Sequence, residues 1–177
     1  MINVEYSKTN ISWEFNRELV RFELENIIYA AYVNRQNYIN IQVGLNFITT
    51  EEYFHDLDGK LLLHYNQNSG LIEWNYKNIS ERMIVENLSN VGFFPNQGIV
   101  LVRNNDGRVK IINLLTKELC DVKAPDGHEM IYFQESDQGI TIVCDGDENH
   151  TDKYGRNRHN FELDIETGNL KHKGLSY

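Results

Sequence analysis

Short alternating runs of apolar and polar residues, separated by turn signals, fill most of this chain. Asp58-Gly59, Ser69-Gly70 and Asp106-Gly107 each precede or separate runs of about four residues in which apolar side chains alternate with polar ones. Asp-Gly between such runs is a strong hairpin signal, because the primed two-residue turns need positive φ at both central positions. The spacing between these turns leaves too little chain for helices. We therefore predict an all-β fold built from antiparallel hairpins.

One early segment is ambiguous. Residues 12–22 are compatible with a short helix that has Ser12 as its N-cap, and equally with a strand. The two prolines, Pro95 and Pro125, do not lie in a Pro- or Ser-rich linker. No change of composition marks a boundary, so we expect residues 1–177 to form a single domain.

Two stretches of the chain align with each other. Residues 97–102 match 138–143 at an offset of about 41, and residues 112–119 match 163–170 at an offset of about 51. The second copy therefore carries about ten extra residues, near 145–158. Residues 54–61 form a looser third copy. A period near 40 with a strand, a hairpin and a short turn in each unit is typical of propeller-like β repeats.

The chain is short for a closed ring, which needs roughly four to eight four-stranded blades. We expect a partial or small propeller-like architecture in which residues 1–26 form an N-terminal cap. The blade-like units are then residues 27–76, 83–123 and 129–174. An unclosed ring exposes a concave inner face and sheet edges, both of which suit a protein partner.

The phrase from Leu163 to Leu170, Leu-Asp-Ile-Glu-Thr-Gly-Asn-Leu, closes the last repeat. It resembles the outer-strand turn of quinoprotein-type β-propeller blades, in which an acidic residue or Asn, a Thr and a Gly end each blade. The resemblance implies a fold and no cofactor, because the tryptophan-docking repeats of the quinone enzymes are absent.

Composition and charge narrow the class of protein. The formal net charge of -9 disfavours direct binding to nucleic acid and favours a basic protein partner, although acidity for solubility alone is an equal alternative. The first residues lack a secretory signal, and no apolar run is long enough to cross a bilayer, so we expect a cytoplasmic protein. Cys120 and Cys144 are then reduced thiols rather than a disulfide framework.

Catalytic and metal signals are weak. The six histidines form no metal-spaced pair, although His150 and His159 flank the inserted loop and could meet across a hairpin. The run from Asp145 to Asp152 departs from a calcium loop, with His150 where Gly is needed and Arg156 in place of the final Glu. No nucleophile motif or phosphate loop is present. We predict no catalytic residues, metal or cofactor.

The inserted loop carries four carboxylates within eight residues, and we interpret it as an acidic finger for a basic surface or as a solvated hairpin tip. Other acidic and aromatic positions of the sheets could join a contact surface. The candidate partner-binding residues are Asp145, Asp147, Glu148, Asp152, Tyr154, Glu51, Glu52, Asp56 and Trp74.

A small, acidic, β-repeat chain without catalytic motifs resembles the immunity proteins that neutralise toxic nuclease domains exchanged between competing bacteria. The resemblance implies a one-to-one complex in which carboxylates block the basic cleft of the toxin and steer its capture. Two other interpretations stay open. One is a β-repeat scaffold or small-ligand module with an aromatic-lined pocket at the strand ends. The other is a degenerate hydrolase, which would need several of these carboxylates or histidines to converge.

Overall fold

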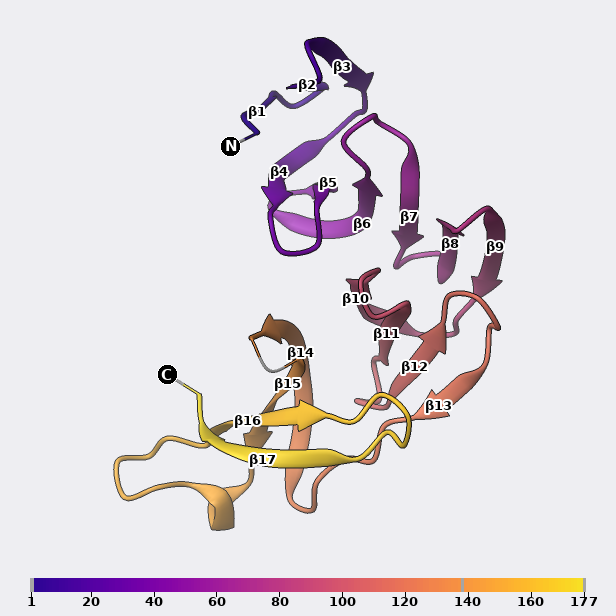
Figure 1. The fold of residues 1–177 in the computed structure, drawn as a ribbon. Coiled ribbons are helices and arrows are strands. Elements are labelled where there is room, and N and C mark those ends of the chain that lie inside the picture. The colour runs from indigo at the N-terminus through magenta and orange to yellow at the C-terminus, as the bar shows by residue number, and fades with distance from the viewer. Residues whose placement is uncertain (1, 138, 177) are drawn as a thin grey trace. The chain divides into compact units, whose positions relative to one another are not determined.

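The computed structural model describes residues 2–137 and 139–176. Over this part of the chain it contains strands β1 to β17 and a single short 3₁₀ turn, η1, which confirms the all-β prediction (Figure 1). Gln138, the first residue of one predicted repeat, lies outside the described residues. The chain divides into two compact units, residues 1–86 and 87–177, and each is described by itself.

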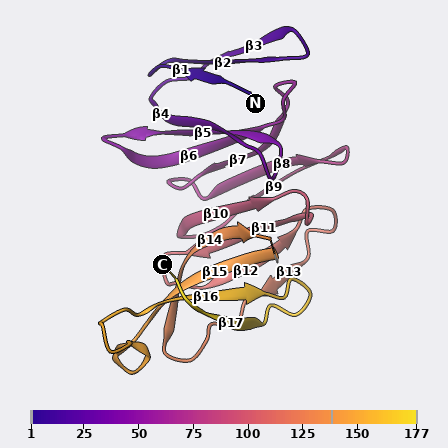
Figure 2. The same ribbon diagram turned by 60° about the vertical axis from the view of Figure 1, so that its left-hand side comes forward.

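The first unit contains two antiparallel sheets. The smaller has the order β1-β2-β3, and the larger is a six-stranded meander from β4 to β9, in which each strand pairs with the next (Figure 2). The strands are β1 (Val4–Tyr6), β2 (Asn10–Phe15), β3 (Glu18–Glu23), β4 (Ile27–Val33), β5 (Tyr38–Leu45), β6 (Ile48–His55), β7 (Leu61–Asn66), β8 (Leu71–Tyr76) and β9 (Ile79–Ile84).

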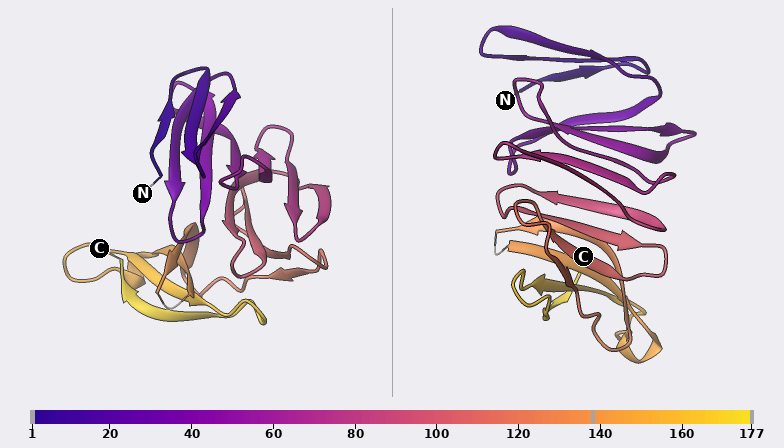
Figure 3. Two further views of the ribbon diagram at one scale, coloured as in Figure 1. Left: turned by 45° about the horizontal axis from the view of Figure 1, so that its top comes forward. Right: turned by 90° about the vertical axis from the view of Figure 1, so that its right-hand side faces the viewer.

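The second unit contains two four-stranded meanders, β10-β11-β12-β13 in rose to salmon shades and β14-β15-β16-β17 in orange to yellow shades in Figure 3. Its elements are β10 (Leu88–Phe94), β11 (Ile99–Asn104), β12 (Val109–Asn113), β13 (Leu119–Asp121), β14 (His128–Ser136), β15 (Gly139–Gly146), η1 (Glu148–His150), β16 (Arg158–Leu163) and β17 (Leu170–Leu175). Four-stranded antiparallel meanders are the blade units of propeller-like folds, so the chain is a propeller-like β scaffold.

The ambiguous segment 12–22 is a hairpin of β2 and β3, not a helix. Its turn, Asn16-Arg17, has φ of 51° and 69°, and the turns at Asn46-Phe47 and Lys77-Asn78 have the same sign at both positions. These are primed two-residue turns without glycine, which Asn tolerates better than most residues. Such turns give the weakest sequence signal, which explains the ambiguity.

The Asp-Gly signals do mark hairpins, but the turns have a different conformation from the one expected. At Asp58-Gly59 and Asp106-Gly107 only the glycine has positive φ, 88° and 82° respectively. The amide of Gly59 donates to the carbonyl of Asp56, and the amide of Asp56 donates to the carbonyl of Lys60. This pattern is a type I turn followed by a left-handed glycine, the usual three- to four-residue hairpin loop.

The core of the first unit lies between the β1–β3 sheet and the neighbouring strands of the larger sheet. It is centred on Trp13, which is 2% exposed and packs with residues such as Ile11, Ile39 and Ile41. The indole Nε1 of Trp13 donates a hydrogen bond of 2.8 Å to the carbonyl of Leu57. This contact ties β2 to the loop after β6, 44 residues away.

A repeat that the sequence interpretation missed follows from the strand register. Trp13 pairs with Val20 across the β2–β3 hairpin, and Trp74 occupies the matching place opposite Glu81 in β8–β9. Residues 13–26 and 74–87 share Trp, Arg, Glu and Asn at equivalent positions. The N-terminal cap therefore contains a partial copy of the repeat.

The two sheets of the second unit pack face to face around Leu101, Ile111, Ile142 and Phe161. The predicted range 83–123 contains β10–β13, and the range 27–76 contains β4–β8. The range 129–174 covers β14–β17 except for His128 at the start of β14 and Leu175 at the end of β17. Gly168, in the turn between β16 and β17, holds the sheets together because its carbonyl accepts from the amide of Lys123 at 2.9 Å.

Candidate partner-binding site

The inserted loop, residues 145–158, leaves the end of β15, passes through η1 and returns at the start of β16. Figure 2 shows it extending past the ends of the strands of its own sheet. Asp147 is the N-cap of η1 and accepts from the amide of Asn149. The loop is thus an ordered projection of the second unit, positioned as a finger.

Two of its carboxylates are neutralised within the loop. Arg158 binds Asp145 through two hydrogen bonds, of 2.7 and 3.1 Å. Arg156 donates to Asp152 at 2.8 and 2.6 Å. These hydrogen bonds hold the pKa of each aspartate below its ordinary value. Two of the four carboxylates of the finger expected from sequence are therefore compensated, because Asp145 and Asp152 are each paired with an arginine.

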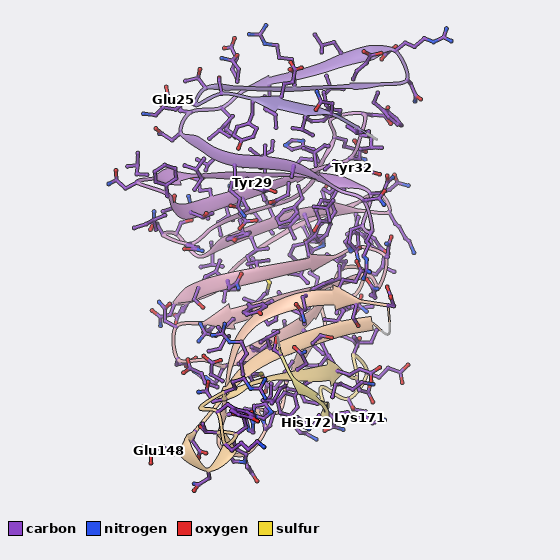
Figure 4. All side chains as sticks on the ribbon, turned by 90° about the vertical axis from the view of Figure 1, so that its left-hand side faces the viewer. Glu25, Tyr29, Tyr32, Glu148, Lys171 and His172 are labelled. Carbon is purple, nitrogen blue, oxygen red and sulfur yellow. The ribbon has the colours of Figure 1, made fainter. Side chains whose placement is uncertain are left out.

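The remaining finger residues are oriented differently. Glu148 is exposed at η1 and points away from the loop (Figure 4). Tyr154 is 70% exposed, and the cationic groups of Lys153 and Arg156 lie 4.8 and 5.3 Å from its ring centroid. The finger thus presents an aromatic ring between two cations beside a carboxylate, which is an amphipathic surface rather than an acidic one.

Four histidines meet at the base of the finger, a constellation that the sequence indicated only for His150 and His159. The ring centroid of His128 lies 4.3 Å from that of His150 and 5.0 Å from that of His159. His172 lies 5.1 Å from His159. The register of β14 to β17 brings them together, with His159 opposite Cys144 on β15 and His172 opposite Phe161 on β16.

The hydrogen bonds of this cluster assign the ring protons. Nε2 of His159 must donate to the carbonyl of His150 at 2.9 Å, so in the neutral ring its Nδ1 accepts from Nε2 of His172 at 2.9 Å. His128 donates from Nδ1 to the carbonyl of Asp126, and its buried Nε2 has no partner in the structure. Burial and the adjacent imidazoles lower the pKa of His172.

Asp147 and His150 form the outer contact of the cluster. Nδ1 of His150 lies 2.7 Å from Oδ1 of Asp147, and this hydrogen bond lowers the pKa of the aspartate. Over residues 2–137 and 139–176, no three His, Cys, Asp or Glu side chains are arranged to hold a metal ion.

The second group of predicted residues does not form one surface. Trp74 is 1% exposed, and Glu52 lies in a buried hydrogen-bond network with Asn40 at 2.9 Å and the Tyr65 hydroxyl at 2.8 Å. Burial raises the pKa of Glu52, and these hydrogen bonds partly oppose the rise. Because β-strand residues alternate between faces, the adjacent Glu51 lies on the other face of the sheet. Trp74 offers no exposed contact area, and the carboxylate of Glu52 is engaged in its own hydrogen-bond network.

Glu51 belongs to a polar row that crosses three strands. His64 places Nε2 at 3.2 Å from Glu51 and Nδ1 at 2.8 Å from Glu73, and the Tyr53 hydroxyl donates to Glu51 at 2.9 Å. The ring of Tyr53 stacks on His64 at 4.3 Å. Burial and the hydrogen bond to Glu51 raise the pKa of Tyr53.

This row is a convergence of carboxylates and histidine of the kind that the hydrolase interpretation required: Glu51 and His64 are among the residues it considered, whereas Glu73 is not. The cross-strand register Tyr53–His64–Glu73 creates it. Both ring nitrogens of His64 are engaged by carboxylates, so the row fits a cross-strand ionic bridge as well as a proton-transfer site. Asp56 lies apart, where its carboxylate accepts from the amide of Lys60 in the β6–β7 turn.

The β5–β6 hairpin carries three exposed large apolar residues at its tip, among them Phe47, the most exposed large apolar residue in the described part of the chain, and the sequence interpretation missed them. Leu45, Phe47 and Ile48 are 63%, 91% and 68% exposed. Strand β4 pairs with β5 only as far as Val43, and β7 pairs with β6 only from Glu51, so the tip extends beyond both neighbours. The sequence signal that could have identified this tip is Phe47, an aromatic residue in the two-residue turn between β5 and β6.

Two pockets bear on the small-ligand interpretation, one along the middle of β8 and β9 and the other at strand ends of the β10–β13 sheet. One, of about 400 Å³, is lined by Trp74 with polar and charged residues of β8 and β9. The other, of about 590 Å³, lies at the end of the β10–β13 sheet and is lined by both aliphatic and acidic side chains. The small-ligand interpretation expected an aromatic lining, and only the first pocket contains an aromatic residue among its described lining residues.

No family model and no curated protein matches this chain. Among solved structures it is similar to the dihydro-heme d1 dehydrogenase NirN, with a TM-score of 0.49, 9% identity and coverage of 95% of this chain and 43% of that chain. It is similar to the β-propeller domain of Swd1 from Myceliophteria thermophila, with a TM-score of 0.48, 10% identity and coverage of 89% and 61%.

The WD40 β-propeller domain of Doa1 is a further similar structure, with a TM-score of 0.40, 14% identity and coverage of 98% and 50%. The chain therefore spans about half the length of these structures. Identities this low relate folds and not activities. Within the described residues, no helix is long and apolar enough to span a membrane.

Proposed function

We propose that this chain is a non-enzymatic immunity or antitoxin protein of the cytoplasm. It binds a basic partner, a nuclease toxin domain, in a one-to-one complex and blocks the partner's active-site cleft. The observation that carries the proposal is the β5–β6 tip, an exposed apolar surface on a chain with a net charge of -9. An apolar anchor combined with opposite charge is the usual composition of a specific protein interface.

The tip suits the role of anchor because its shape is set before binding. The two-residue turn at Asn46-Phe47 holds Phe47 outward with φ of 63°, and the flanking strands pair from Leu45–Ile48 onward. A rigid aromatic side chain loses little conformational entropy when it enters a pocket. Apolar residues of this exposure are a cost to a free protein unless a partner covers them.

Net charge determines which partner is favoured. Carboxylates exceed cationic side chains, 26 against 17, so the long-range field attracts a basic domain and repels an acidic one. Steering of this kind raises the association rate and depends on salt. Glu148 and Tyr154 are the finger residues placed to contact the partner, because Asp145 and Asp152 are already paired.

The test first looks for a neighbouring gene that encodes a large secreted protein, and the C-terminal domain of that protein is then the candidate toxin. We expect a one-to-one complex, loss of nuclease activity and an association rate that falls steeply with ionic strength. A nuclease that stays active at saturating concentrations of this chain would refute the proposal, and an association rate independent of salt would remove the electrostatic part.

A pair of variants localises the interface. Phe47→Ser should weaken binding about tenfold or more, the loss typical of a buried aromatic anchor. Leu19→Ser is the matched control, because Leu19 is 70% exposed on a different hairpin and should leave affinity unchanged. Equal effects of the two substitutions would exclude the β5–β6 tip as the anchor.

A further inference from the structure

The 590 Å³ pocket of the second unit is a groove with an aliphatic lining and an acidic rim. Ile99 and Ile111, on β11 and β12, are buried, whereas Leu119 on β13 is 53% exposed and Ile165 is 37% exposed. Glu118, from the β12–β13 turn, and Glu166, from the β16–β17 turn, also line the groove. Residues more than 40 positions apart therefore combine apolar surface and negative charge in one place.

The charge at this rim is uncompensated. Among the described residues, neither Glu118 nor Glu166 has a cationic group within 4.0 Å, and Glu118 accepts only from the Thr116 hydroxyl, at 3.0 Å. On the finger, by contrast, Asp145 and Asp152 each bind an arginine. The negative potential that the second unit offers to a partner is therefore stronger at the groove than at the paired part of the finger.

A long aliphatic chain that ends in a cation fits this combination. The methylene stem of lysine or arginine packs on leucine and isoleucine while its charged head stays near water and carboxylates. A purely apolar ligand would leave the two carboxylates unused, and a small inorganic cation would leave the exposed Leu119 and Ile165 uncovered. Charge complementarity and apolar contact thus select the same ligand.

We propose that this groove binds a lysine or arginine side chain presented by the partner protein. The identity of the source rests on the proposed function, since a basic domain supplies such side chains. The groove then adds a second, specific contact to the apolar anchor at the β5–β6 tip. The groove is then the place on the second unit where the negative charge of the chain meets a cation of the partner.

The experiment needs no partner. A peptide, acetyl-Gly-Lys-Gly-amide, is titrated into the ¹⁵N-labelled full chain and compared with the same peptide carrying norleucine, which keeps the stem and lacks the ammonium group. We expect the lysine peptide to shift the amide resonances of Leu119 and Ile165 and to bind about fivefold more tightly than the norleucine peptide. A fivefold ratio corresponds to two partly exposed ion pairs.

Matched variants test the carboxylates. The double variant Glu118→Gln, Glu166→Gln should bind both peptides equally. The control, Asp126→Asn with Glu129→Gln, removes the same amount of charge from exposed carboxylates of the unit that do not line the groove, and it should keep the fivefold difference. Equal affinities in the unmodified chain, shifts that map to another surface, or absence of lysine-peptide binding would each overturn the inference. None of these results affects the comparison of Phe47→Ser with Leu19→Ser, so failure of the groove and failure of the proposed function are separable.

Discussion

Gly168 lies where the β16–β17 turn touches the end of β13, next to the groove. Its φ is 68°, and a Cβ added there would lie 2.2 Å from the carbonyl oxygen of Asp121. Its carbonyl also accepts from the amide of Lys123 at 2.9 Å. Gly155, in the finger, has φ of 79° and no atom within 4 Å of an added Cβ. The two glycines share a backbone conformation and differ in their surroundings.

The different surroundings of the two glycines determine how much stability an alanine should cost at each position. Alanine in the left-handed region costs about 1 kcal/mol at either position. At Gly168 the clash with a backbone carbonyl adds about 1–3 kcal/mol, and loss of the Lys123 hydrogen bond adds about 1 kcal/mol. We expect Gly155→Ala to lower the free energy of unfolding by about 1 kcal/mol and Gly168→Ala to lower it by about 3–5 kcal/mol.

Urea denaturation followed by far-UV circular dichroism measures both values, and thermal melts provide a check at about 2–4 °C per kcal/mol for a chain of this size. The lysine peptide adds a functional readout, because Gly168→Ala should displace Ile165 and Glu166 and weaken the peptide's binding. Equal losses of stability in the two variants would refute the close packing of the β16–β17 turn against β13.

Three further predictions concern titration, thiol reactivity and the core. The pKa of His172 lies below its ordinary value of 6.5, so this residue takes up a proton in the unfolded chain first as pH falls. The contribution of His172 to stability is therefore complete above pH 6.5 and is lost below it. His172→Asn should flatten the fall in melting temperature between pH 7.5 and pH 5.5, and an unchanged slope would contradict this prediction. Burial raises the pKa of Cys144 to about 12, whereas Cys120 is partly exposed. Iodoacetamide at pH 8 should therefore label Cys120 and leave Cys144 unlabelled in the native protein. Mass spectrometry of the peptides identifies the labelled cysteine, and labelling of Cys144 would contradict the prediction. Trp13→Phe removes the donor to the buried carbonyl of Leu57 and should cost about 1–3 kcal/mol in urea denaturation, and a smaller loss would show that this carbonyl finds another donor.

Much of the fold follows from local chemistry. The period-two alternation and the turn residues predicted antiparallel hairpins, and the spacing of the turns placed the last two sheets near their observed ranges, because both signals act within a few residues. The same reasoning was weakest at Asn16-Arg17, where a primed turn forms without glycine. Local signals also could not distinguish a primed turn from the type I turns at Asp58-Gly59 and Asp106-Gly107.

The candidate surfaces depended on tertiary structure. The sequence shows four carboxylates in the finger, but only the register of β15 with β16 brings Arg158 to Asp145, 13 residues away. Glu51 and Glu52 are adjacent in sequence and lie on opposite faces of one sheet, so Glu51 joins His64 in the polar row and Glu52 joins Asn40 and Tyr65 in a separate hydrogen-bond network.

By itself, the sequence determined the class of fold, the positions of most hairpins, the net charge and the absence of familiar catalytic motifs. Tertiary structure decided which charges are compensated, which aromatic residues are covered, and where Phe47 and the Glu118–Glu166 rim are exposed. The physical reason is range: strand propensity and turn geometry are set by neighbours in the chain, whereas charge pairing and burial are set by residues that only folding brings together.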